Sequence, residues 1–214
     1  NEEGQPLSKR LRGEYSIEAL REAGFEPMAV TSFLAKLGTS DAAAARTELG
    51  VLADEFVPSE VGRSGHRFDM KELQRVNAAL MHMTPFEEVS ERLAERGIDG
   101  GAEFWDAVRP NLTLFDGVAE WWHVAHGPVE PVIEAEDADF ITAAAAALPV
   151  EPWDETTWKT WTSTLKDETG RKGKGLFMPL RLALTGLRHG PELANLLPLL
   201  GRERALARLG GQKA

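Results

Sequence analysis

The sequence predicts an all-α protein built from two helical lobes. Three observations support this fold class: apolar residues recur at helical spacing, capping residues and glycines bracket those segments, and alternation with a period of two is scarce. The stretches that most resemble strands are RFDM at residues 67–70 and PVI at 131–133. We expect the two lobes to meet near residues 83–85.

The first two helices are predicted from their ends. Ser16 is a typical N-cap for the segment that closes at Gly24, and Pro27 stands in the first turn of a second helix that ends at Gly38. Within the second helix, apolar residues at helical spacing form one stripe, which we assign to the core. These residues are Val30, Phe33, Leu34 and Leu37.

Two more helices follow in the first half of the chain. Asp69 and Glu72 form a capping pair at the start of MKELQRVNAALMHM. Thr84 as N-cap, Pro85 at the first position and Gly97 as terminator predict the next helix. The segment between the second and third of these helices looks irregular.

The second half continues with helices and holds all the tryptophans. Helices are predicted at 114–125, 137–148, 154–167, 174–186, 191–199 and 202–209. All six tryptophans fall between residues 105 and 161. Trp158, Trp161 and Leu165 share one helix face, a pattern that favours a core stripe over a platform for RNA bases.

Composition excludes several classes of protein. Hydrophobic residues make up 43% and charged residues 27%, which is typical of globular proteins. No apolar run approaches the roughly 18 residues of a membrane span, and the first residues lack a secretory segment. Without cysteine there are no disulfides or thiolate metal sites, and His123 and His126 make half a metal site at most. We expect a cytoplasmic protein with no metal and no membrane partner.

Charge is distributed unevenly along the chain. The net charge is −10, yet residues 163–214 hold ten Lys and Arg against four Asp and Glu, a net charge of +6. A basic surface on an acidic body can steer a polyanion to one face. The alternative is a charged C-terminal segment that is merely solvated.

Catalytic motifs are scarce, and two basic segments remain. The chain has no cysteine nucleophile, no G-x-S-x-G turn and no H-E-x-x-H pair. The first basic segment is PLSKR at residues 6–10. The second, TGRKGKGLFMPLRLALTGLRHGPEL at 169–193, interleaves glycines with cations and continues into an apolar helix. Pro179 there predicts a kink or a fresh helix start, and the glycines allow close approach to a phosphate or base.

With these segments in place, the sequence resembles the C-terminal part of bacterial glutamyl-tRNA synthetases, which are class I enzymes. Three stretches carry the resemblance: LSKRLRGEYSIEALREAGFEPMAV at 7–30, FDMKELQRVNAALM at 68–81 and GKGLFMPLRLALTG at 173–186. Their order and spacing extend over nearly the whole chain, and the third is the most specific to the family.

The resemblance implies a role for the first basic segment. PLSKR stands at the position of the KMSKS-type loop, in which Lys9, with Ser8 and Arg10, helps to stabilise the triphosphate of ATP. The sequence departs from the family by having Pro6 where the loop's first lysine stands. ATP and magnesium are the cofactors of the parent enzyme, and none is expected for this part of it.

The resemblance also implies three regions. Residues 1–13 correspond to the loop of the catalytic domain, 14–83 to a stem-contact helical region, and 84–214 to a helical anticodon-binding domain. Five residues are predicted to lie near RNA, the last two by a weaker alignment: Lys172, Lys174, Arg181, Arg109 and Asn111. Arg181 could instead pair within the protein, and its neighbours could serve packing.

The implied function is the tRNA-binding part of a glutamate-tRNA ligase. The family's nucleotide-binding domain should precede this chain in a longer protein, so this part alone is expected to be a monomer, inactive in aminoacylation, that binds glutamate tRNA. Whether the parent also charges glutamine tRNA is left open. The alternative is a helical interaction module that no longer binds RNA and docks a protein through its acidic residues 130–139.

Overall fold

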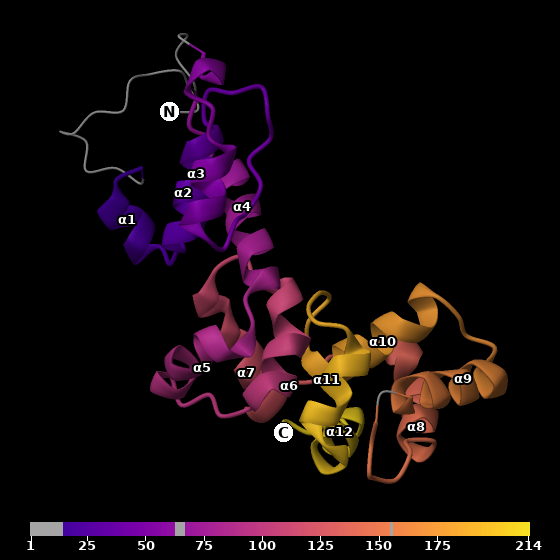
Figure 1. Ribbon diagram of the computed structural model, residues 1–214. Helices are drawn as coiled ribbons and strands as arrows, with labels where there is room; N and C mark the ends of the chain where they lie inside the picture. The colour runs from indigo at the N-terminus through magenta and orange to yellow at the C-terminus, as the bar shows by residue number, and fades with distance from the viewer. Residues whose placement is uncertain (1–14, 63–66, 155) are drawn as a thin grey trace. The chain divides into compact units, whose positions relative to one another are not determined.

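The computed structural model describes residues 15–62, 67–154 and 156–214 (Figure 1). Across these ranges every regular element is a helix, so the predicted all-α class is confirmed. The two strand-like stretches are not strands. In the second, the Val132 N–H bonds singly to the Leu182 carbonyl at 3.1 Å, and no ladder continues from it. No helix in the described part of the chain is long and apolar enough to span a bilayer.

The chain forms two compact helical units. Unit 1 contains the described residues up to Asp99 together with Arg109–Val118, and unit 2 contains Gly100–Val108 and Ala119–Ala214. The chain therefore passes between the units three times. The functional boundary expected at residues 83–84 concerns RNA contacts and stays a prediction.

Unit 1 is built mainly from α2 and α4, which pack together. The Ser16 hydroxyl accepts the Ala19 N–H at 3.0 Å, and the Asp69 carboxylate accepts the N–H of Lys71 and Glu72, so both predicted caps are confirmed. The elements are α1 (Ile17–Glu22), α2 (Pro27–Lys36), α3 (Leu49–Glu55), η1 (Pro58–Glu60), α4 (Met70–Met83), α5 (Phe86–Glu95), η2 (Arg109–Asn111) and η3 (Phe115–Gly117).

The core of unit 1 includes part of the stripe predicted for α2 and one buried amide. Val30 and Phe33 are buried in it, whereas Leu34 is 44% exposed. Fully buried Asn77 on α4 accepts the N–H of Glu26 at 2.8 Å and donates to the Thr113 carbonyl. This side chain therefore ties α4 both to the start of α2 and to the segment before η3.

Two features of unit 1 differ from the prediction. Thr84 does not cap α5, because its hydroxyl donates to the Leu80 carbonyl at 2.9 Å and closes α4 instead. Pro85 is the residue that precedes α5, and it makes no side-chain cap. The helix α3 was not predicted from the sequence. The residue before it is Glu48, which makes no side-chain capping bond, so no capping signal marks its start.

Unit 2 contains the six helices predicted in the second half and the unpredicted α6; the helix predicted at 202–209 has those bounds, and the others differ from the prediction by one to four residues at one or both ends. Trp161 and Leu165 are buried as expected, while Trp158 is half-buried. The elements are α6 (Gly101–Val108), α7 (Val118–His126), η4 (Ala135–Asp137), α8 (Ala138–Ala146), α9 (Thr157–Thr169), α10 (Lys174–Thr185), α11 (Leu193–Leu200) and α12 (Arg202–Leu209).

Arg208 on α12 is the buried polar centre of unit 2. Its guanidinium donates to the carbonyls of Val124 at 2.8 Å, Leu184 at 2.7 Å and Gly127 at 2.9 Å, and its Nε donates to the Ala214 oxygen at 2.8 Å. The last carbonyls of a helix lack intrahelical donors and carry a partial negative charge, so one cation joins the ends of α7 and α10. Burial lowers the pKa of Arg208 to about 10, which leaves it charged at neutral pH.

Candidate nucleic-acid interface

The connection between α9 and α10 presents the central part of the second basic segment. Gly170 ends α9 at φ 69°, with its N–H on the Lys166 carbonyl at 3.0 Å, and Gly173 precedes α10 at φ 55°. Both lie in the left-handed region that favours glycine. The two glycines bracket a tight connection in which Arg171 and Lys172 stand side by side.

Arg171 turns toward the protein. Its guanidinium lies 4.4 Å from the centre of the Phe140 ring and pairs with the Asp137 carboxylate. It also donates to the Gly175 carbonyl at 3.2 Å. That carbonyl has no helical donor, because Pro179 four residues later lacks an N–H. α10 therefore runs through Pro179 as one helix rather than starting afresh there.

Lys172 and Lys174 turn outward. Both are exposed, and neither has an ion pair with another described residue. Lys174, Phe177 and Arg181 lie at positions i, i+3 and i+7 of α10, so they share one helix face. We call Lys172 together with these three residues the α10 face.

Arg181 is half-buried at the far end of the α10 face. One nitrogen, Nη2, donates to the Pro191 carbonyl at 2.9 Å, whereas Nη1 is buried and has no hydrogen-bond partner among the described residues. Burial lowers the pKa of this guanidinium. The internal pairing considered from the sequence thus accounts for one nitrogen, while the second is buried without a partner among the described residues.

The remaining predicted site residues lie elsewhere. Arg109 and Asn111 belong to η2 in unit 1, so they are not part of the α10 face. The Arg109 guanidinium donates to the Thr84 carbonyl at 3.0 Å and so helps to close α4, while Asn111 is exposed. The loop residues Ser8, Lys9 and Arg10 lie outside the described residues.

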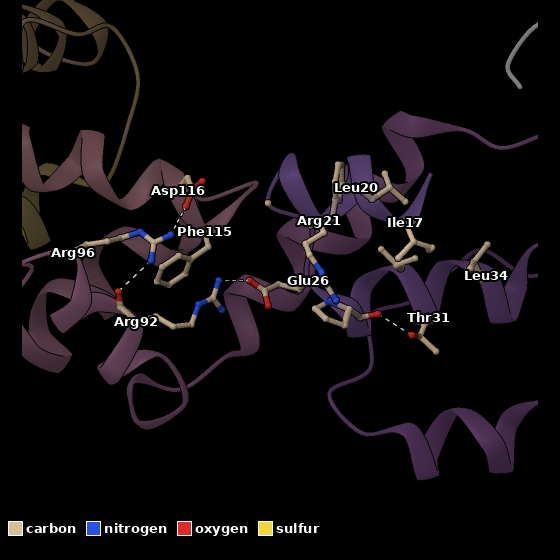
Figure 2. Close-up of a pocket in the computed structure, with 14 residues that line it drawn as sticks. Ile17, Leu20, Arg21, Glu26, Thr31, Leu34, Arg92, Arg96, Phe115 and Asp116 are labelled. Carbon is tan, nitrogen blue, oxygen red and sulfur yellow. Dashed lines mark hydrogen bonds and ion pairs between the residues drawn. The ribbon is translucent and has the colours of Figure 1, made fainter. Parts of the chain in front are cut away.

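Unit 1 has a cleft of about 460 Å³ that the sequence did not reveal (Figure 2). Arg92 and Arg96 on α5 place their guanidinium carbons 3.8 and 4.8 Å from the centre of the Phe115 ring. Each is also paired, Arg92 with Glu26 at 2.8 Å and Arg96 with Asp116 at 2.7 Å. These pairs tie α5 to α2 and η3, so their charges are already offset within the protein.

The rest of the cleft is mostly apolar, with Arg21 and Thr31 as its polar members. Its other wall comes from α1 and α2 and includes Ile17, which is 63% exposed, and Leu34. Within residues 15–62, 67–154 and 156–214, no group of three or more His, Asp or Glu side chains could hold a metal ion. Of the two regions, the α10 face is the one in which exposed lysines gather.

Comparison with known proteins shows what this chain is similar to. Residues 129–212 match the family described as an anticodon binding domain. The chain is 59% identical over 210 residues to glutamate-tRNA ligase 1 of Parvibaculum lavamentivorans, and 50% identical over 208 residues to that of a Chelativorans species. This chain is a relative of the bacterial glutamate-tRNA ligases. The match includes 98% and 96% of this chain but 46% and 45% of those proteins, so it spans about half the length of its curated relatives.

Solved structures of glutamate-tRNA ligases share the fold. A ligase from Elizabethkingia meningosepticum superposes with a TM-score of 0.69 at 22% identity, over 89% of this chain and 41% of that one. One from Elizabethkingia anophelis gives 0.68 at 20% identity, with the same coverage. The predicted resemblance to this ligase family is confirmed, and the roles of individual residues stay predictions.

The anticodon-domain match covers only part of the predicted RNA site of this ligase relative. Lys172, Lys174 and Arg181 lie within residues 129–212, whereas Arg109 and Asn111 precede them. The acidic residues between 130 and 139, which the alternative assigned to protein docking, also lie within 129–212, and two of them form ion pairs inside the protein. Asp137 pairs with Arg171, and Glu134 lies 3.6 Å from Arg188.

Proposed function

We propose that this chain is the tRNA-binding part of a glutamate-tRNA ligase and that its α10 face contacts the anticodon loop. One observation carries the proposal: the segment that matches an anticodon binding domain holds two exposed lysines that have no ion pair with another described residue. Lys172 and Lys174 neutralise phosphates, and Arg181 lies on the same face.

The regions predicted from the sequence complete the proposal. Residues 14–83 contact the tRNA stem, and residues 84–214 bind the anticodon arm, with Arg109 and Asn111 near its last anticodon base. In the whole cytoplasmic enzyme, which we take to be a monomer, residues 1–13 close over ATP with magnesium, and Lys9 offsets triphosphate charge. The reaction joins ATP, L-glutamate and tRNA to give glutamyl-tRNA, AMP and diphosphate.

The test is binding of glutamate tRNA by the 214-residue chain. We expect binding that is tighter than to a tRNA for another amino acid and that weakens as salt rises. Replacing Lys172 and Lys174 by alanine should weaken it. The control Lys71→Ala/Lys213→Ala removes the same charge away from the α10 face and is compared on the anticodon stem and loop alone, because residues 14–83 are proposed to contact the rest of the tRNA. Equal binding of all tRNAs, or none at low salt, contradicts the proposal.

A further inference from the structure

Phe177 is an exposed aromatic ring in the middle of the α10 face. Among the Phe, Tyr and Trp side chains of the described ranges, the exposed ones are Phe56 in unit 1 and Phe177 in unit 2, which is 43% exposed. Phe177 lies between Lys174 and Arg181 on the same helix face. Because the ring is partly exposed, its burial contributes only part of the stabilisation that a fully buried ring would give. Its place between two cations suits a ligand that has both a flat surface and negative charge.

Phe177 packs against Trp158, which in turn packs against Trp161. Its ring centre lies 6.1 Å from that of Trp158 with an angle of 32° between the planes, and Trp158 lies 5.6 Å from Trp161 edge to face. Trp161 is buried, and its Nε1 donates to the Ala144 carbonyl at 3.0 Å. The exposed ring is therefore backed by side chains anchored in the core, which limits the entropy lost when a ligand stacks on it.

We propose that Phe177 is a stacking shelf for one unpaired base of the anticodon loop, with Trp158 as its support. This inference rests on the proposed function and deepens it. Every base has a π-face, and stacking on an aromatic side chain is a common way to hold unpaired bases. Phe177 has no hydrogen-bonding group, so it fixes where the base lies without selecting which base it is. Lys172 and Lys174 hold the adjoining phosphates.

Charge favours RNA over a protein helix at this place. Lys174 and Arg181 flank the ring on its helix face, and an apolar partner helix offers nothing to offset their charge. Asp154 lies just before α9, and its carboxylate accepts hydrogen bonds from the Thr156 hydroxyl at 2.7 Å and from the N–H groups of Thr156 and Thr157. The hydrogen bond from the Thr156 hydroxyl, followed by those from the N–H groups, lowers the pKa of Asp154, so this carboxylate serves the start of α9.

The experiment measures binding of an RNA hairpin that carries the anticodon stem and loop of glutamate tRNA. We expect Phe177→Leu to bind roughly tenfold more weakly, because leucine keeps the apolar bulk and loses the ring, and Phe177→Tyr to bind within about twofold of the wild type. Val150→Ala is the matched control, since Val150 is an apolar residue of unit 2 that is 76% exposed. Circular dichroism shows whether each variant remains folded.

Abasic substitutions in the hairpin identify the stacked base. Each loop nucleotide in turn is made abasic, and the cost of Phe177→Leu is measured again with each RNA. At one position the variant should lose nothing further, since the base that stacked on the ring is already gone. Equal cost of Phe177→Leu with every abasic hairpin, or equal binding of Phe177→Leu and the wild type, overturns the shelf.

The outcomes separate this inference from the proposed function. If the wild-type chain binds no anticodon hairpin and no glutamate tRNA, the tRNA proposal fails and the shelf fails with it. If Lys172→Ala/Lys174→Ala weakens binding while Phe177→Leu does not, the tRNA proposal stands and the shelf alone is wrong. A shelf that stacks a base leaves the salt dependence unchanged in Phe177→Leu, whereas loss of a phosphate contact reduces it.

Discussion

Two regions of unit 2 use the cations of the basic stretch 163–214 in opposite ways. At the centre, Arg208 is fully buried and donates to four backbone oxygens. On the α10 face, Lys172 and Lys174 are exposed, and Arg181 keeps a nitrogen unpaired. The first arrangement holds helices together, and the second leaves donors for a ligand.

The difference shows that the net charge of a segment overstates how many of its cationic side chains are available to bind RNA. Arginine has a planar fork of five donors that suits carbonyl groups at helix ends, whereas lysine is a flexible point charge that tends to stay in water. Arg202 donates to the Pro149 carbonyl and Arg204 to the Ala125 carbonyl, each at 3.0 Å, so they resemble Arg208 rather than Lys172.

The largest expected effect comes from Arg208→Met. It leaves buried carbonyls at the ends of α7 and α10 without donors, so the free energy of unfolding should fall by about 3–5 kcal/mol. Urea unfolding followed by tryptophan fluorescence measures this in unit 2 alone, since all six tryptophans lie there. A loss below about 1 kcal/mol would show that Arg208 is not the structural centre.

Arg171→Ala should lower the same free energy by about 2 kcal/mol, because it removes a ring contact, an ion pair and the donor to the Gly175 carbonyl. In a Pro179→Ala background the helix supplies its own N–H to that carbonyl, so the cost of Arg171→Ala should shrink by about 1 kcal/mol. Additive costs in this double-mutant cycle would refute the link between the proline and the arginine.

Arg92→Ala tests the paired arginines of the unit 1 cleft. It removes the contact with Phe115 and the pair with Glu26, which is partly exposed, so a loss of about 1 kcal/mol is expected. Urea unfolding followed by far-ultraviolet circular dichroism should show it, while the tryptophan signal from unit 2 stays unchanged. A shift of the tryptophan signal alone would be inconsistent with this assignment.

The smallest effect on stability should come from Lys172→Ala/Lys174→Ala. Both side chains are exposed and lack ion pairs with described residues, so the free energy of unfolding should change by less than about 0.5 kcal/mol. Thermal unfolding compares this variant with the wild type. A loss as large as that of Arg171→Ala would mean that the lysines serve the fold.

Local signals predicted most of the helices but little of the site geometry. Caps such as Ser16 and Asp69 act within one turn, so the sequence shows them directly. The partners of Arg208 include Val124, 84 residues away, and no local pattern marks that contact. The prediction for Thr84 was wrong because a threonine between two helices can cap the next helix or bond back to the previous one. The sequence is compatible with both arrangements.

The Phe115 cleft and the unpartnered nitrogen of Arg181 could not be predicted from the sequence either, because both depend on residues that are distant in sequence. The cleft needs α1, α2, α5 and η3 together, and the state of Arg181 depends on where Pro191 lies. What the sequence did indicate was the α9–α10 segment itself, through its glycines and lysines.

The most direct test of the account is the salt dependence of anticodon-hairpin binding for the wild type and for Lys172→Ala/Lys174→Ala. If both lysines contact phosphates, the slope of log K against log salt should become shallower by roughly 1.4 to 1.8, while Lys71→Ala/Lys213→Ala keeps the wild-type slope. Identical slopes for the wild type and the Lys172/Lys174 variant would contradict the claim that the α10 face binds RNA.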